Sequence, residues 1–142
     1  MADVQKVLDD AVYAKLQANA TLRGYGIYNT SPPTMQERPR EEGGRELPFV
    51  IFQYSGDRLD RTFDRRMFIC AYLVKAVSES PWPKEAARIA DEIDTVLEDA
   101  SLTVTGFTHV ACLRDTGVRF TEEVGGRIFT HAGAIYDIWE DA

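Results

Sequence analysis

The chain has 142 residues, of which 44% are hydrophobic and 27% are charged, and its formal net charge is −7. This length and composition predict one globular domain over residues 1–142 rather than a disordered segment. No apolar run approaches the roughly 20 residues that a membrane span needs. An acidic chain without a basic stripe is also a poor candidate for specific nucleic-acid binding.

The first segment, MADVQKVLDDAVYAKL, is acidic and amphipathic. It lacks the basic and apolar regions of a secretory signal, so we do not expect one. Asp3 is a candidate helix cap. The following apolar residues have the spacing of one helical face: Val4, Val7, Leu8, Ala11, Val12 and Leu16. The pattern ends by Asn19, and GIYNT after it is expected to be a short extended segment.

Residues 29–47 combine three prolines, two adjacent glycines and many charges, without periodicity. They predict one long charged loop. Loops of this length are uncommon in compact domains and are usually functional or disordered. Two interpretations stay open, a partner-binding arm that orders on assembly and plain disorder.

Residues 48–55 and 67–77 are predicted to be strands, joined by a charged hairpin connection over 56–66. Both contain runs, FVIF and MFICAYLV, that are apolar on both faces rather than alternating. Such strands are expected to be covered on both sides. Two helices can cover one face. We expect another subunit to cover the second face, with another sheet or a folded-back 29–47 loop as the alternatives.

The segment after SESPWP is the clearest predicted helix, and Ser80 is its candidate cap. Its apolar stripe consists of Ala86, Ile89, Ile93, Val96, Leu97 and Ala100. Residues 84–99 hold six acidic and two basic residues, which we interpret as a solvated face. The alternative is an acidic surface that lines a channel, with these candidates: Asp91, Glu92, Asp94, Glu98 and Asp99.

The last third predicts three β segments, separated around Gly106, residues 115–117 and the hairpin glycines Gly125 and Gly126. The order of elements is then helix, two strands, helix, three strands. This order predicts an α+β fold, a mostly antiparallel β-sheet with two α-helices packed on one face.

The candidate chemical groups are few. Cys70 and Cys112 lie in apolar segments and are interpreted as reduced core residues rather than a disulfide or redox pair. His109 and His131 lie on neighbouring predicted strands and could meet as metal ligands. We interpret them instead as strand residues with ordinary hydrogen bonds. With no nucleophile elbow and no phosphate-binding glycine motif, we expect no enzyme activity, no metal and no cofactor.

Residues 36–66 carry seven arginines and seven acidic residues. Balanced charges on loops beside apolar strands suit a subunit contact, in which arginine–carboxylate pairs fix the register. The candidate interface residues in this stretch and in the last strand are Arg38, Arg40, Arg45, Arg58, Arg61, Arg65, Arg127, His131 and Trp139.

Four segments together resemble the tail completion or tail terminator proteins of long-tailed bacteriophages. They are the opening helix VLDDAVYAKLQANATLRG, the strand LPFVIFQ after a Pro-rich loop, the central helix with its exit AARIADEIDTVLEDASLTVTGF, and the closing VACLRDTGVRF…GGRIFTHAGAIYDIW. The resemblance covers nearly the whole chain. It departs from the family pattern at Trp82, which follows the second strand instead of lying in it, and in the long charged 29–47 loop.

The resemblance implies a structural virion protein. Such a protein forms a homo-oligomeric ring, expected to be hexameric, that caps the tail tube, ends its polymerisation and provides the tail side of the head–tail joint. The implied partners are the tail tube protein and a head connector or completion protein. DNA passes through the ring without specific binding, and no membrane is involved. The implied location is the head-proximal end of the tail in the virion, and the host cytoplasm during assembly. The alternatives are a head-completion or connector protein of the same virion and a small His-dependent metal-binding protein.

Overall fold

The computed structural model describes residues 4–32, 46–62 and 65–141, without the side chains of residues 60–62 and 65. In chain order the elements are α1 (Val4–Gln17), α2 (Ala20–Arg23), β1 (Gly26–Asn29), β2 (Phe49–Thr62), β3 (Arg65–Ser78), α3 (Lys84–Leu97), β4 (Thr108–Val124) and β5 (Arg127–Asp141). The strands form one five-stranded sheet in the order β1-β2-β3-β5-β4. Only β1 and β2 run parallel. The predicted α+β class and mostly antiparallel sheet are confirmed.

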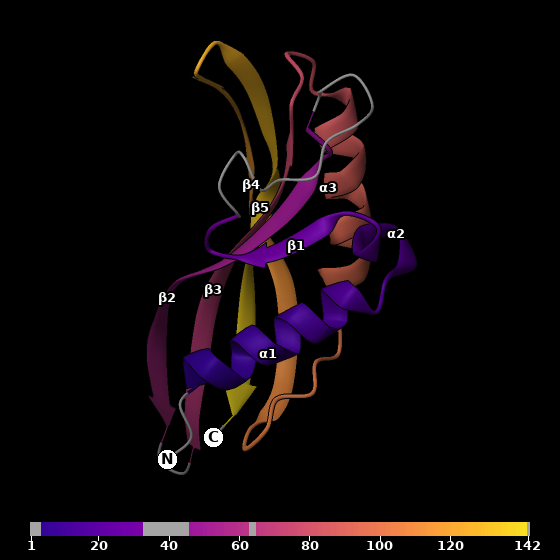
Figure 1. Ribbon diagram of the computed structural model, residues 1–142. Coiled ribbons are helices and arrows are strands. Elements are labelled where there is room, and N and C mark those ends of the chain that lie inside the picture. Colours follow the sequence, from indigo (N-terminus) through magenta and orange to yellow (C-terminus); the bar gives the residue numbers. More distant parts are fainter. Residues whose placement is uncertain (1–3, 33–45, 63–64, 142) are drawn as a thin grey trace.

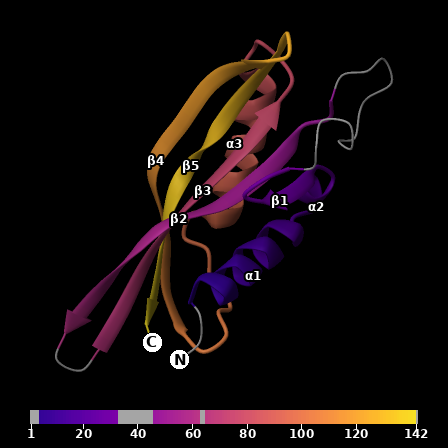
Figure 2. The ribbon, with the colours of Figure 1, turned by 60° about the vertical axis from the view of Figure 1, so that its left-hand side comes forward.

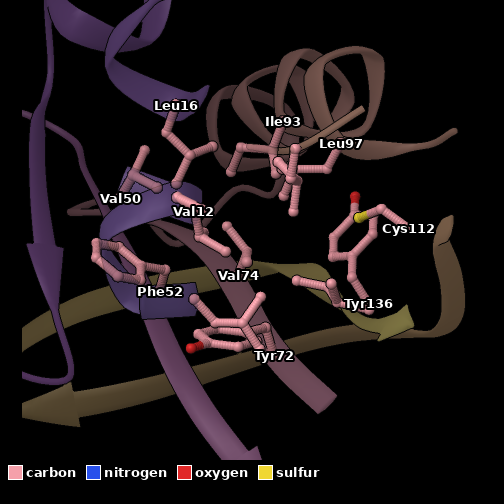
Figure 3. Close-up of a cluster of buried hydrophobic side chains, with 14 of the residues drawn as sticks. Val12, Leu16, Val50, Phe52, Tyr72, Val74, Ile93, Leu97, Cys112 and Tyr136 are labelled. Carbon is pink, nitrogen blue, oxygen red and sulfur yellow. The ribbon is translucent and has the colours of Figure 1, made fainter. Parts of the chain in front are cut away.

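All three helices lie on one face of the sheet, called here the covered face (Figures 1 and 2). Their apolar stripes pack against alternate strand residues in one core, part of which Figure 3 shows. Two deeply buried tyrosines in this core keep their hydroxyl groups bonded. Tyr72 donates to Asp9 over 2.6 Å, and Tyr136 donates to Asp94 over 2.8 Å. The two tyrosines therefore contribute their rings to the apolar core, and their hydroxyl groups still have hydrogen-bond partners.

The first helix ends as predicted, with Leu8, Ala11, Val12 and Leu16 buried. The expected cap at Asp3 lies outside the described residues. The short helix α2 was not predicted. It begins at Asn19, whose side-chain oxygen accepts from the backbone N–H of Leu22 over 3.0 Å. The residue that marks the end of one helix therefore caps the next.

β2 and β3 form the predicted hairpin, but the expected connection over 56–66 is too long, because β2 continues to Thr62 and β3 begins at Arg65. A bulge between Tyr54 and Gly56 interrupts the pairing, and the register then continues to the ends of both strands. The distal part of this hairpin extends away from the helices (Figure 2). The described side chains of β2 in this part, Asp57, Arg58 and Leu59, are exposed.

The predicted break at residues 115–117 is also wrong. The register shifts between Arg114 and Thr116, so a bulge lies inside the single strand β4. By contrast, the predicted turn at the glycine pair is confirmed. Gly125 and Gly126 have φ values of 59° and 78°. Positive φ at both central residues is what a type I′ hairpin requires.

The second long helix is confirmed with its predicted stripe, in which Ala86, Ile89, Ile93 and Leu97 are buried. The expected cap is wrong. Pro83 occupies the N-cap position without a side-chain bond. Ser80 Oγ instead accepts from the backbone N–H of Trp82, over 3.1 Å, before the helix starts.

Cys70 and Cys112 are confirmed as free, buried core residues. Burial raises the pKa of each thiol to about 12. Along residues 4–32, 46–62 and 65–141, no helix combines the length and the hydropathy that crossing a membrane requires.

Candidate subunit interface

The sheet face turned away from the helices, called here the open face, is apolar at its centre. Phe49, Ile51, Val77 and Phe129 form a second buried cluster to which no helix contributes. Ile69 is buried further along β3, and Leu73 and Ile135 are half-buried between these regions. The central strands are thus apolar on both faces, as their sequence predicts.

A pocket of about 170 Å³ opens beside this second cluster. The apolar side chains of the cluster form its floor, and Pro32 and Val124 belong to its wall. Two polar residues, Glu122 and His131, complete the lining. An apolar pocket with a few polar groups at one side is a typical binding site for one side chain or a small ligand.

His131 is a buried polar residue of the open face, and it contacts two residues of β4. Its ring stacks on Phe120, with 4.3 Å between the ring centroids, and its Nε2 lies 2.8 Å from Glu122 Oε1. Lys75 Nζ lies 5.0 Å from the centroid of the Phe120 ring. Burial lowers the pKa of His131, although the hydrogen bond to Glu122 opposes this. The neutral ring then donates from Nε2 and offers Nδ1 as an acceptor.

The Nδ1 atom of His131 is buried, and no described residue provides it with a hydrogen-bond partner. The same holds for the indole Nε1 of Trp139, further along β5. Buried polar groups are usually paired, and each exception requires a physical explanation. Both atoms belong to residues that the sequence pattern nominates for a subunit interface, and both residues occupy the open face.

Arg127 lies at the start of β5 and links three segments. Its guanidinium contacts the carboxylates of Glu46, at 3.1 Å, and Glu79. Glu46 is almost completely buried. These contacts join the residues before β2 and after β3 to the start of β5. At Arg127 the structure shows this internal contact, and a contact to a second subunit there stays a prediction.

At the other end of the open face, Arg58 is exposed on β2 and pairs in register with Ile69. Burial and Asp115 raise the pKa of Asp137, whereas Arg58 lowers it. Arg58 therefore lies on the same face as Trp139, with Ile69 of β3 between them.

The two histidines do not meet. His109 pairs in register with Glu140, and a bulge at Val110 separates it from Ala111. Its Nδ1 lies 2.5 Å from Glu140 Oε1, and its Nε2 lies 2.9 Å from the Ala100 carbonyl oxygen. The bulge reverses the alternation of side chains, so His109 lies on the opposite face of β4 from Ala111 and Leu113. In the part of the chain that the structure describes, no group of three or more His, Cys, Asp or Glu residues could hold a metal.

The acidic candidates on and after α3 fall into two groups. Glu92 accepts from Asn19 over 2.8 Å, Asp94 accepts from Tyr136, and Glu98 accepts from the backbone of Arg114 over 2.6 Å. These three carboxylates hold the helix to its neighbours. Asp91 and Asp99 are exposed.

Arg38, Arg40 and Arg45 lie outside the described residues. The structure does not describe the side chains of Arg61 and Arg65, although the backbones of both residues pair between β2 and β3. Their proposed interface role stays a prediction.

Sequence reasoning missed Lys75, Phe120 and Glu122 as neighbours of His131. These residues come from β3 and β4, on either side of β5, and only the strand register brings them together. The alternation in GVRFTEE places Phe120 and Glu122 on one face. It does not indicate which strand they adjoin.

No protein-family model and no curated protein matches the sequence. Among solved structures, the fold is similar to that of a chain in the virion of a native gene transfer agent particle, with a TM-score of 0.74 and 14% identity over 100% of both chains. A second solved chain, which bears only a sequence identifier as its name, has a TM-score of 0.55 and 12% identity over 96% of both chains. The chain therefore shares its whole fold, without close sequence similarity, with a chain of a gene transfer agent virion.

Proposed function

We propose that this chain is a structural, non-enzymatic protein of a phage-like virion, and within that class a tail terminator. Copies of the chain form a ring, expected to be hexameric, on the end of the tail tube. The ring stops tube polymerisation and presents a surface to a head connector or completion protein. The observation that carries the proposal is the shared fold over the full length of a gene transfer agent virion chain.

The open face supports assembly in this proposal. It carries an apolar pocket and two buried polar atoms that lack partners among residues 4–32, 46–62 and 65–141. A second subunit can cover the apolar surface and pair these atoms, and burial of apolar surface is the main favourable term in such an association. The predicted interface residues His131 and Trp139 occupy this face.

The negative net charge of the chain is compatible with a ring through which DNA passes without binding. The net charge is −7, and Asp91 and Asp99 are exposed on and after α3. If α3 lines the ring, its carboxylates repel the phosphate backbone and let DNA pass without specific binding. Glu92, Asp94 and Glu98 add negative charge there while they also hold α3 in place.

The test is light scattering coupled to size-exclusion chromatography over a range of protein concentrations, alone and with purified tail tube protein. A ring predicts a discrete oligomer, visible by negative-stain microscopy, or a ring that forms only on tube ends. A chain that stays monomeric in both conditions contradicts the proposal. Capture of a portal or connector, but not of the tube, would instead indicate a head-completion protein of the same virion.

A further inference from the structure

Trp82 is the most exposed large apolar side chain of the described residues, with 73% of its surface accessible. It lies between β3 and α3, flanked by Pro81 and Pro83, and its backbone N–H donates to Ser80 Oγ. Because proline fixes its own φ, Pro81 and Pro83 restrict the backbone on either side of Trp82. A restricted backbone reduces the entropy lost on binding, and tryptophan is enriched among interface hot spots.

The Trp82 segment and the pocket lie at the same end of the sheet but on opposite faces. On the covered face, Thr130 Oγ1 donates to the Ser80 carbonyl oxygen over 2.6 Å, which fixes the segment beside β5. The next residue, His131, lines the pocket on the open face. One molecule therefore presents a projecting aromatic side chain on one side and an apolar pocket on the other.

The pocket matches an indole in size, polarity and hydrogen bonding. Its volume is about 170 Å³, and a protein cavity of roughly 150 Å³ admits benzene. Its floor is apolar, and the buried His131 Nδ1 has no partner among the described residues. Because His131 donates from Nε2 to Glu122, Nδ1 is an acceptor, whereas the indole N–H is a donor only.

We propose that Trp82 of one copy of the chain inserts into this pocket of a second copy and donates its indole N–H to His131 Nδ1. Each copy contributes the tryptophan from one face and the pocket from the other, so the contact is head-to-tail. Head-to-tail contacts close into a ring where the rotation between copies permits. The inference rests on the self-assembly that the proposed function includes, and it names the contact that holds the copies together.

The first test compares Trp82→Ala with Val110→Ala, which truncates another exposed apolar side chain far from the pocket. Both variants are analysed under the condition in which the wild type assembles. Loss of a hot spot weakens an interface by at least about 30-fold. We expect that loss for Trp82→Ala and nearly wild-type assembly for Val110→Ala. If Trp82→Ala assembles like the wild type, this inference fails while the proposed function stands.

The hydrogen bond is tested with Trp82→Phe, His131→Phe and the double variant. Each single variant removes one side of the bond and should weaken assembly by about 2- to 10-fold. If the two groups bond to each other, the double variant is weaker than the wild type by less than the product of the single effects. Strictly multiplicative effects would overturn the bond between Trp82 and His131.

The direction of the contact is tested with Pro81→Cys and Val124→Cys, which place thiols beside the tryptophan and at the pocket wall. The native thiols are buried with raised pKa values and should not react. In the double variant, oxidation should produce a ladder of covalent dimers, trimers and higher oligomers. Products that stop at the dimer would overturn the head-to-tail arrangement. A Val124→Cys thiol that resists a maleimide in the monomer would show that the chain fills its own pocket, and would overturn the inference.

Discussion

The two faces of the sheet differ in how their buried polar side chains are hydrogen-bonded. On the covered face, Tyr72 and Tyr136 donate to carboxylates of the helices, and each ring nitrogen of His109 has a hydrogen-bond partner. Two oxygens on this side lack a described partner: Oε2 of Glu140, whose other oxygen contacts His109, and Oε1 of Gln17 at the end of α1. On the open face, His131 and Trp139 each keep one buried nitrogen without a partner among the described residues.

This difference indicates which buried polar groups find their hydrogen-bond partners within one chain and which do not. A buried polar group without a partner loses roughly 1–3 kcal/mol of solvation. The covered face avoids most of this loss with residues that are distant in sequence but belong to the same chain. The open face combines unpaired nitrogens with an apolar pocket, which suits a surface that another chain completes. Four predictions test the comparison, from the largest expected effect to the smallest.

The first prediction uses two isoleucines of β5 that face opposite sides of the sheet. Ile138 is buried in the covered core, and Ile135 is half-buried on the open face. Ile138→Ala should lower the free energy of unfolding of the isolated subunit by about 3 kcal/mol, and Ile135→Ala by about 1 kcal/mol or less. Urea denaturation measures both. Equal losses would show that the chain itself buries both faces to the same degree.

The second prediction concerns Gly133, two residues before Ile135 on β5. A Cβ atom there would lie 2.2 Å from the Val74 carbonyl oxygen and 2.5 Å from Lys75 Cα. Because backbone atoms cannot rotate away, Gly133→Ala should cost about 2 kcal/mol of stability. The control is Gly117→Ala, whose Cβ would meet only the flexible Arg114 side chain. Similar thermal stability of the two variants would contradict the close approach of β3 to β5.

The sequence predicts the covered face well, because local periodicity determines it. The stripes of α1 and α3 and the two-sided apolar strands follow from residue spacing alone. The glycine pair likewise specifies its turn. These features depend on residues within a few positions of one another, so no knowledge of distant contacts is needed.

The sequence predicts the strand ends and the site poorly, for a different reason. The bulges at Ser55, Val110 and Asp115 depend on the partner strand, and each reverses the alternation of side chains beyond it. This is why His109 lies with Glu140 rather than with Ala111. The neighbours of His131 likewise depend on the β3-β5-β4 order, which places residues some 45 positions apart on a common surface.

The third prediction tests the completed hydrogen bonds of the covered face. His109 contacts Glu140, whose side chain is fully buried and whose pKa is raised by burial against the effect of the His109 bond. His109→Ala leaves this carboxyl group without its partner and should cost about 1.5 kcal/mol. Glu140→Gln keeps a hydrogen-bond partner for the imidazole, because an amide can both donate and accept, and it should cost less. If His109→Ala unfolds at the wild-type urea concentration, the bond contributes nothing to the stability of this face.

The fourth and smallest effect is the pH dependence of the isolated subunit through His131. Burial lowers its pKa below the usual 6.5, and the nearby Lys75 acts in the same direction, whereas Glu122 opposes both. Between the lowered and the usual pKa, the unfolded chain binds more protons than the folded chain. The contribution of His131 is therefore complete above pH 6.5 and is lost as the pH falls. The urea midpoint of the wild type should therefore fall relative to that of His131→Phe as the pH decreases through this interval. Subtracting the two profiles removes the opposite contribution of Glu140, whose raised pKa makes stability fall as the pH rises. A difference that stays constant with pH would mean that His131 does not titrate differently in the folded chain, and that the open face does not bury it as the geometry indicates.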